Sequence, residues 1–597
     1  MESSSPGVSP AAWLLASREL FAKMLGEFCY EELLRPVPAS DGCYLIALPS
    51  GVEYCFRARR GSFGAWRVNP ASITRRCEGA DGAADDPLQF VLDARRVLGL
   101  DAITVAEVLR EMMATLRADA WLRAESPTAA ELADLSYVDL EGYQTGHPCM
   151  VLNKGRLGFS VSDITKYAPE SRQDVRLVWI AVHHTLGNYH GPPAPELLEE
   201  ELDEVTRAEF ASALAQAEGT DPAEYDWMPV HPWHWDEAVV PLFAPYLADR
   251  MIVRLGIAPD RYRPLQSIRT LVNLDAPHRR NVKLPLLIRN TLVWRGLGRE
   301  AIEAAPEVTE WLLGIRERDP FLSTESRMVP LGEVASVAVH HPLFEQLSDA
   351  PYRYHELLGV VWRDPVEVEL DPGERARTMA ALLQVDPAGR ALVTELVERS
   401  RLDARTWLHR LLGALLPGLL HYLYRYGVAF CPHGENTVVI FDRDHVPVRI
   451  AVKDFAEDVN LLPDALPEYA DLPPLADAVL LRWPAEELRH SLLSAVFAGH
   501  FRFFSDLVAT HLGVPEPEFW QLVRDAILGY QARFPELAGR FAAFELLGPS
   551  FPRVALNREQ LLSGGFHDRP DCDATFDITH GTIPNPLHIG HLPSEPE

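Results

Sequence analysis

Residues 431–455, CPHGENTVVIFDRDHVPVRIAVKDF, place polar side chains at both ends of two apolar runs. His433, Glu435 and Asn436 come just before the first run, and Asp454 follows the second. An amide oxygen and a carboxylate held side by side are hard ligands of the kind that Mg²⁺ takes when it carries nucleotide phosphates. The residue types therefore indicate an enzyme that uses ATP and Mg²⁺.

A β-hairpin is the element that would position these groups. Residues 437–441 and 448–452 are apolar and rich in β-branched side chains, and the charged residues 442–444 suit a turn between them. Such a hairpin returns Asp454 to the side of Asn436. A surface hairpin with a polar rim and no ligand is the alternative for this segment alone.

A second polar group lies on a predicted hairpin formed by residues 263–274 and 281–288. Its hydroxyl and cationic side chains are Ser267, Arg269, Thr270, Lys283 and Arg295. Two hydroxyls and three cations on one hairpin form a clamp for phosphate groups. An exposed, charged hairpin is the competing interpretation.

A third polar group is the loop GHPCMVLNKGRLGFS, residues 146–160. His147, Lys154 and Arg156 gather there among glycines, and such a nest of donors would hold a phosphate or a carboxylate. The loop lacks the G-x-x-x-x-G-K-[ST] pattern, so it is not a Walker A loop. A loop whose basic residues only balance nearby acids is the alternative.

The composition bounds the class of protein. A chain of 597 residues is expected to form two to four domains. The net charge of −29 argues against a nucleic-acid partner, and it means that an anionic substrate needs a local cluster of cations. Only five of the 56 basic residues are lysines, and Lys154, Lys283 and Lys453 fall in the polar groups above. Lys453 and His433 would add donors for phosphates.

The cysteines and the N-terminus indicate a cytoplasmic protein. The seven cysteines are scattered, and no C-x-x-C occurs, which suits a reducing compartment. Residues 1–20 lack a basic region followed by a long apolar run, and no stretch of 18 uninterrupted apolar residues appears, so no membrane association is expected.

Helices and strands are predicted in separate regions, which favours an α+β fold. Periodicity predicts helices over 11–36, 87–125, 196–218, 374–426 and 475–545, and strands over 43–48 and 52–57 in addition to those named above.

Five motifs occur in a fixed order: GHPCMVLNKGRLGFS, VHPWHW, SIRT, VKLPLLI followed by Arg295, and PHGENTVVI followed by KDF. In this order the chain resembles the NRPS-independent siderophore synthetases, the aerobactin-synthetase or IucA/IucC-type family. The H-P…N-K-G-R form is similar to the subgroup that condenses hydroxamate-bearing carboxylates, as in desferrioxamine assembly.

The resemblance implies a cupped-hand fold: a thumb over residues 1–160, fingers over 161–395 and a kinase-like palm over 396–597. It implies adenylation of a carboxylic acid (citrate, or a citryl or succinyl derivative) followed by attack of a polyamine, hydroxylamine or alcohol, with release of AMP and pyrophosphate. It also implies a homodimer.

The resemblance further implies residue roles. The family's ATP contacts fall on Ser267, Arg269, Thr270, Lys283, Arg295, His433 and Asn436, and its magnesium ligands on Asp454, Asn436 and Glu435. His147, Lys154 and Arg156 are expected to orient the acyl-adenylate. Two departures stand out: Met150-Val151 replaces a second His-Pro, and Cys431 replaces a glutamate.

Two other classes of protein remain as alternatives. A small-molecule kinase would need a catalytic Asp four or five residues before Asn436, and none is there. A non-catalytic siderophore-binding protein would also need cation clusters. The products separate the three: AMP and pyrophosphate, ADP, or none.

Overall fold

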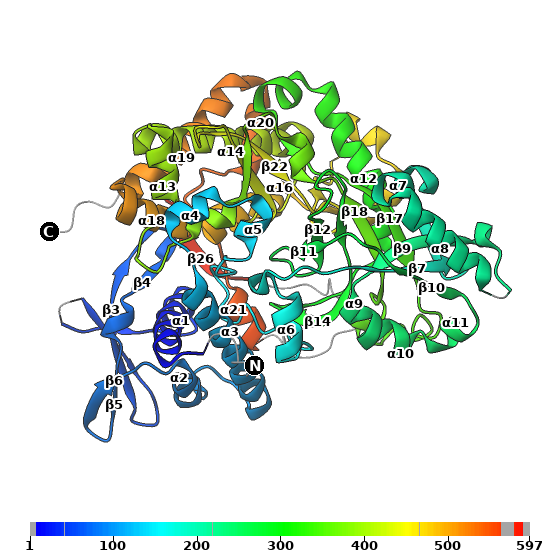
Figure 1. Cartoon of the computed structure of the whole chain (residues 1–597). Helices are drawn as coiled ribbons and strands as arrows, with labels where there is room; N and C mark the ends of the chain where they lie inside the picture. The colour runs from blue at the N-terminus through cyan, green and yellow to red at the C-terminus, as the bar shows by residue number, and fades with distance from the viewer. Residues whose placement is uncertain (1–7, 41, 218, 465, 563–577, 589–597) are drawn as a thin grey trace.

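The computed structural model describes residues 8–40, 42–217, 219–464, 466–562 and 578–588. The chain contains both helices and strands (Figure 1). Runs of strands and runs of helices follow one another, without a regular alternation of single strands and single helices. The predicted mixture of helix and strand is therefore confirmed.

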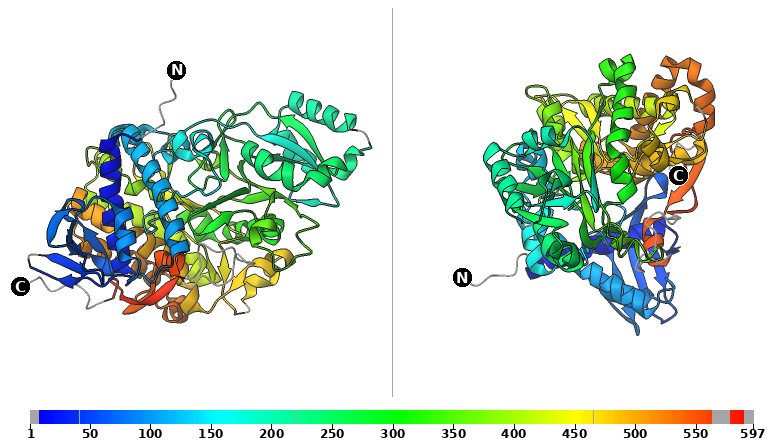
Figure 2. Two further views of the ribbon diagram at one scale, coloured as in Figure 1. Left: turned by 90° about the horizontal axis from the view of Figure 1, so that it is seen from below. Right: turned by 90° about the vertical axis from the view of Figure 1, so that its right-hand side faces the viewer.

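The N-terminal part packs two long helices beside a sheet. α1 (Pro10–Tyr30) and α3 (Ala102–Glu125) lie against each other because both bury apolar side chains in one core. Leu561 of α21 (Leu556–Leu562) joins the same core, so a late segment of the chain returns to its beginning (Figure 2). The sheet has the order β1-β2-β3-β5-β6 with β4 on β3; these strands, β1 to β6, are Val37–Pro38, Cys43–Ala47, Glu53–Arg60, Trp66–Val68, Thr74–Cys77 and Ala80–Ala83.

Two sheets form the middle part. One has the order β10-β7-β9 and the other the order β11-β12-β13-β18-β17-β8. Helix α12 (Arg299–Arg318) packs along β17 (Figure 1). The strands are β7 Val178–His183, β8 Gly187–His190, β9 Tyr225–Val230, β10 Ile252–Ile257, β11 Tyr262–Pro264, β12 Thr270–Asn273, β13 Asn281–Lys283, β17 Glu333–Val339 and β18 Leu358–Arg363.

The hairpin predicted over residues 437–452 lies at the centre of a four-stranded sheet. Its strands β21 (Thr437–Phe441) and β22 (Pro447–Val452) pair antiparallel, as predicted. β19 (Arg375–Thr378) extends the sheet beside β21, and β16 (Val329–Pro330) extends it beside β22. The sheet thus takes strands from both sides of the expected boundary after residue 395, and the division into thumb, fingers and palm stays a prediction.

Helices cover this sheet and carry the largest apolar core. α14 (Ala404–Tyr426) packs on β22, and α19 (Glu516–Arg533) packs on α14. Among the described residues, one helical stretch, Ala485–Leu512, is long and apolar enough to cross a membrane by length and composition. Since 72% of the most apolar 18-residue segment of this stretch is buried, its side chains pack against the protein itself.

Several predicted helices are interrupted. The segment 87–125 forms α2 (Pro87–Ala94) and α3, and the segment 374–426 begins with strand β19 and continues with α13 (Leu392–Ser400) and α14. The segment 475–545 is divided among several helices, from α15 (Pro474–Val479) to α20 (Ala538–Phe544). The helix predicted over 196–218 is two helices, α7 (Ala194–Glu201) and α8 (Glu204–Gln216), because the Asp203 side chain accepts the Thr206 N–H and starts a new helix.

The continuous strand predicted over 263–274 is wrong. Residues 265–269 form a turn between β11 and β12. Ile268 has a φ of 66°, a left-handed conformation that no strand contains. Ser267 and Arg269 therefore lie in a turn and not in a strand.

Candidate functional site

The β21–β22 hairpin brings the two ends of segment 431–455 together. Thr437 lies opposite Val452, and the Lys453 N–H donates to the Asn436 carbonyl over 3.1 Å. The strand interiors are buried, which leaves the polar groups at the open end of the hairpin. Asn436 and Asp454 consequently lie at the same end.

Lys283 and Asp454 form the centre of an ion-pair cluster. The Lys283 Nζ lies 3.0 Å from Asp454 Oδ1 and 2.8 Å from Glu457 Oε2. Glu333 Oε1 is 3.7 Å from the same Nζ, and Arg363 Nη1 is 3.4 Å from Asp454 Oδ1. Two cations therefore share one oxygen of Asp454, and Oδ2 takes part in neither contact.

Burial and charge act in opposite directions on these groups. Burial alone would lower the pKa of Lys283, but the surrounding carboxylates raise that pKa above its usual value. Burial also opposes the charged form of Asp454, yet Lys283 and Arg363 hold the pKa of Asp454 well below its usual range. Both partners are therefore charged at neutral pH. Asp458 differs, because burial and then Asp454 raise its pKa to about 7.

The turn between β11 and β12 carries Ser267 and Arg269 into this cluster. Arg269 Nη2 lies 3.1 Å from Glu457 Oε2, so this carboxylate contacts both Arg269 and Lys283. Thr270 pairs with Lys283 across β12 and β13, and its N–H donates to Ser267 Oγ over 3.2 Å. The structure thus brings these predicted clamp residues together.

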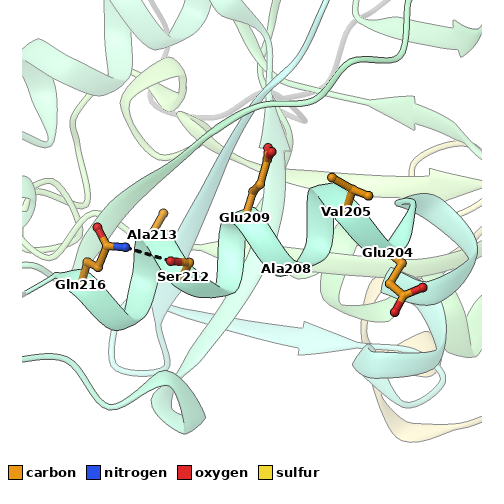
Figure 3. A pocket seen from close by; sticks show the side chains of 7 residues that line it. All are labelled: Glu204, Val205, Ala208, Glu209, Ser212, Ala213 and Gln216. Atoms are coloured by element: carbon orange, nitrogen blue, oxygen red, sulfur yellow. Dashed lines mark hydrogen bonds between the residues drawn. The ribbon is translucent and has the colours of Figure 1, made fainter.

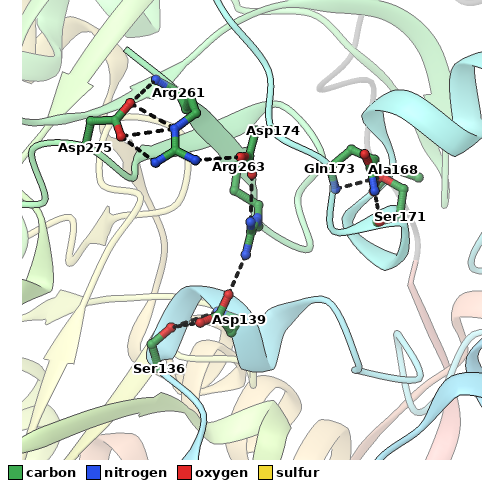
Figure 4. Close-up of polar contacts among 9 residues, drawn as sticks. All are labelled: Ser136, Asp139, Ala168, Ser171, Gln173, Asp174, Arg261, Arg263 and Asp275. Carbon is green, nitrogen blue, oxygen red and sulfur yellow. Dashed lines mark hydrogen bonds and ion pairs between the residues drawn. The ribbon is translucent and has the colours of Figure 1, made fainter.

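Ion pairs fix the strand that leads into the turn (Figure 4). Arg263 of β11 contacts Asp139 of α5 (Tyr137–Glu141) and lies 2.7 Å from Asp174 Oδ1. Arg261, just before β11, lies 2.6 Å from Asp275 Oδ1. These pairs hold the start of the hairpin, and hence its turn, in place.

Arg295 reaches the cluster from a neighbouring hairpin. It ends β15 (Val293–Arg295), opposite Leu286 of β14 (Leu286–Asn290). Burial and then the charge of Arg269 lower the pKa of Arg295 to about 10, and Glu435 acts in the opposite direction. Arg295 therefore stays charged at neutral pH, and it lies close to Arg269 and Glu435.

His433 and His147 present the same kind of donor. In each ring, Nδ1 accepts the backbone N–H groups of the residues two and three positions later, over 3.1 to 3.2 Å. An Nδ1 that accepts leaves the proton of a neutral ring on Nε2. Burial is the largest cause that lowers both pKa values, that of His147 to about 3. Both rings are therefore neutral Nε2–H donors. After burial, the charges of Lys23 and Arg295 further lower the pKa of His147, so Arg295 lies near this ring.

Lys154 and Arg156 take part in ion pairs of their own. Lys154 Nζ lies 2.8 Å from Asp119 Oδ1. Arg156 contacts both oxygens of Glu170, with 2.7 Å between Nη2 and Oε2. Among the contacts of the described residues, neither cation touches Lys283. The pairs hold loop 146–160 in shape, and the expected catalytic part of these cations stays a prediction.

Several members of the cluster were not predicted from the sequence. Glu333 accepts the two N–H groups directly after Asp454, each over 3.2 Å, and fixes the end of β22. An acidic pair three and four residues after Asp454 was a readable signal, whereas single residues on β17 and β18 carry no informative spacing. The missed residues are Glu333, Arg363, Glu457 and Asp458.

Cys431, His433 and Asp458 place three possible metal-ligand atoms within 4.8 Å of one another. A thiolate and an imidazole suit soft or borderline ions. The tautomer of His433 opposes such a site, because Nδ1 already accepts and Nε2 carries the proton. The hard oxygens of Asn436 and Asp454 fit Mg²⁺ better.

A shallow hollow of about 670 Å³ lies along α8 (Figure 3). None of the predicted site residues lines it. Its lining is Glu204, Val205, Ala208, Glu209, Ser212, Ala213 and Gln216, all from one helix.

The chain matches two known families in succession. Residues 136–384 match the IucA / IucC family, and residues 405–567 match the family described as ferric iron reductase FhuF-like transporter.

Individual relatives match nearly the whole chain. The rhizobactin siderophore biosynthesis protein RhbF of Rhizobium meliloti is 39% identical over 587 residues, which cover 98% of this chain and 97% of RhbF. The aerobactin synthase of Escherichia coli is 36% identical, with 94% and 96% covered. The solved aerobactin synthetase IucC of Klebsiella pneumoniae has a TM-score of 0.84 at 32% identity, over 97% of this chain and 98% of that one.

These likenesses define a ligase of siderophore biosynthesis, an enzyme that joins a carboxylate to an amine. The chain belongs to the IucA/IucC family of NRPS-independent siderophore synthetases. The predicted family and class of enzyme are confirmed, and the named relatives favour neither the kinase nor the non-catalytic alternative.

Proposed function

We propose that the cluster around Lys283 binds ATP with Mg²⁺ and that the enzyme adenylates a carboxylic acid there. The acid is citrate or a citryl or succinyl derivative, and an amine, hydroxylamine or alcohol then attacks the acyl-adenylate. The observation that carries the proposal is the contact of Lys283 with both Asp454 and Glu457, beside Arg269. The fold is shared with an ATP-bound aerobactin synthetase IucA of Klebsiella pneumoniae, at a TM-score of 0.76 and 17% identity.

Cations and neutral donors divide the work on the nucleotide. Lys283, Arg269 and Arg295 supply charge for the triphosphate, and His433 donates an uncharged N–H. Since ion pairs fix Lys283 and Arg269, and two backbone N–H groups fix the His433 ring, these side chains need little rearrangement as charge develops in the transition state. The proposed ATP contacts are Ser267, Arg269, Thr270, Lys283, Arg295, His433 and Asn436.

Asn436, Asp454 and Glu435 are the proposed ligands of Mg²⁺. The Asn436 Nδ2 donates to Asp458 Oδ2 over 2.7 Å, which fixes the amide and leaves its oxygen as a ligand. Asp454 offers Oδ2. All of these are the hard oxygens that Mg²⁺ requires, and the bound ion would neutralise phosphate charge.

The reaction has two steps at one site. A carboxylate oxygen of the acid attacks the α-phosphorus, the bond to the β-phosphate breaks, and pyrophosphate leaves. The nucleophile then attacks the acyl carbon, and AMP leaves. We assign to His147 the orientation of the acyl-adenylate through its Nε2–H, with Lys154 and Arg156 holding its loop.

The preference for hydroxamate-bearing acids, the homodimer and the cytoplasmic location belong to the same proposal. The family resemblance supports the first two, and the scattered thiols support the third.

A matrix of carboxylic acids and amines, scored by pyrophosphate release and product mass, tests the function. We expect AMP and pyrophosphate together with a condensed product for at least one pair. ADP as the nucleotide product would favour a kinase, and the absence of turnover with every pair would favour a binding protein.

A further inference from the structure

Lys23 is a cation that the function above does not use. It lies on α1, where its helical neighbours Phe21, Met24 and Leu25 are buried in the N-terminal core. Its Nζ donates to the carbonyl oxygen of His147 over 2.6 Å. A long-range contact therefore joins the first helix to the loop that carries His147.

The acids nearest to Lys23 are already paired. Asp119 accepts from Lys154 Nζ over 2.8 Å, and Glu27 accepts from Arg502 Nη2 over 2.6 Å. Within the described parts of the chain, Lys23 forms no ion pair within 4.0 Å. An ammonium has three N–H donors, and the carbonyl of His147 uses one of them. Burial lowers the pKa of Lys23 to about 8, which Asp119 and Glu27 offset in part.

The position of Lys23 relates it to the proposed active site. Burial is the largest cause of the lowered pKa of His147, and Lys23, His433 and Arg295 follow as its electrostatic neighbours. The His147 ring thus lies near the ammonium of Lys23 and near Arg295, one of the cations proposed for ATP. An anion bound against His147 would lie within reach of the Lys23 ammonium, whose Nζ contacts the carbonyl of the same residue.

A substrate with more than one carboxylate needs such a cation. Adenylation removes the charge of only one carboxylate, and the others remain as anions near a protein of net charge −29. Lys283, Arg269 and Arg295 face the phosphates in the function proposed above. A separate ammonium suits a carboxylate that does not react, because charged hydrogen bonds to carboxylates are strong.

We propose that Lys23, together with the Nε2–H of His147, binds a non-reacting carboxylate of the acid substrate. The inference rests on the proposed function, and it makes Lys23 a determinant of acid specificity rather than a nucleotide contact.

The test uses the full-length chain with the variants Lys23→Met and Lys23→Gln. The control is Lys166→Met, at an exposed lysine of α6 (Val161–Tyr167). Pyrophosphate release is measured once with the acid varied at saturating ATP and once with ATP varied at saturating acid. The acids are citrate and succinate, each compared with a monoamide in which one carboxylate is a neutral carboxamide.

We expect Lys23→Met to raise KM for the acid by about 10-fold to 100-fold, as for a lost charged hydrogen bond, with KM for ATP changed less than about threefold. For the wild type, the monoamide should show a similar rise. In Lys23→Met the monoamide should bind no worse than the acid, because both changes remove the same contact.

An unchanged KM for the acid, or equal rises for acid and ATP, would overturn the assignment. If Lys23→Met fails to fold, KM for the acid and KM for ATP are measured on Lys23→Gln instead, with the same outcomes expected. A wild type that releases no pyrophosphate with any acid would instead contradict the proposed function itself.

Discussion

Asp454 combines a central charge with an unusual backbone. Its φ of 64° is left-handed, a conformation that costs energy for a residue with a Cβ and that Asp and Asn adopt more readily than most. The two N–H groups that follow it are held by Glu333, and its carboxylate is held by Lys283. A conformation that three contacts enforce fits a side chain whose direction matters for function.

Replacing Asp454 by Ala should abolish formation of the acyl-adenylate while the fold survives. Loss of the proposed magnesium ligand should lower the rate by about three decades or more. Pyrophosphate release measures this effect. Asp454→Asn keeps the backbone preference and removes the charge, so it should fail almost as completely.

The matched control is Asp444→Ala, at an exposed position in the turn of the same hairpin. It should retain full activity. A folded Asp454→Ala protein with near-normal pyrophosphate release would show that Asp454 is not a ligand of the proposed Mg²⁺.

His147 allows its two ring nitrogens to be tested separately. An Asn at this position can accept the backbone N–H groups that Nδ1 now accepts, but it lacks a donor at the place of Nε2. We therefore expect His147→Asn to keep the stability of the wild type and to lower kcat by at least about tenfold. KM for ATP should change less than kcat.

Lys154→Ala should behave differently, because it leaves the Asp119 carboxylate without its ion-pair partner. It should lower the denaturation midpoint as well as kcat. Steady-state kinetics and urea denaturation on the two variants distinguish a substrate contact from a loop support. If both His147→Asn and Lys154→Ala fold and keep the kcat of the wild type, loop 146–160 has only a structural role.

At the scale of elements, short-range patterns were readable from the sequence and long-range pairing was not. The β21–β22 hairpin follows from two apolar runs and a charged turn within 25 residues, so local rules suffice. The turn at Ile268 was missed because a β-branched residue favours a strand and is held left-handed here by its surroundings. Lys283 and Asp454 are in contact although they are 171 positions apart in the chain. No local sequence rule predicts a contact over that separation, and only the order of the motifs indicated it.

α21 shows what such a long-range contact does. Asn557 Nδ2 donates to Glu31 Oε1 over 2.6 Å and to the Cys149 carbonyl over 3.0 Å. Its Oδ1 accepts the Val151 N–H over 2.9 Å. One buried amide therefore joins α21, the end of α1 and the loop that carries His147.

Asn557→Ala should destabilise the protein by about 2–4 kcal/mol, because it leaves buried acceptors and a donor without partners. It should also lower kcat, since the loop of His147 loses its anchor. Urea denaturation and pyrophosphate release measure the two effects.

Arg558→Ala, at the half-exposed neighbouring position, is the control and should change neither. Loss of stability without loss of kcat in Asn557→Ala would show that α21 supports the fold but not the loop.

At the scale of the whole molecule, charge is distributed unevenly. The chain carries a net charge of −29, yet Lys283, Arg269, Arg363 and Arg295 gather at one place. An acidic protein repels anionic substrates over most of its surface and attracts them only where its cations are concentrated. This arrangement suits the proposed binding of ATP and of a carboxylic acid, both of which are anions.

Strand pairing between distant parts of the chain decides whether the expected palm is a separate folding unit. In a fragment of residues 396–597, β21 would lack β19 and β22 would lack β16, since both partners come from residues 329–378. All five residues of β21 are buried in the full chain, so two apolar strand edges would be exposed. Exposed apolar edges of this kind pair with other chains.

We therefore expect the fragment 396–597 to aggregate or to unfold without a cooperative transition. A longer fragment, 299–597, keeps α12 and the partner strands, and it should be more soluble and unfold more cooperatively. Size-exclusion chromatography and urea denaturation of both fragments beside the full chain provide the comparison. A monomeric 396–597 with a sharp unfolding transition would show that the hairpin does not need the strands supplied by the middle of the chain, and that the palm is an independent domain.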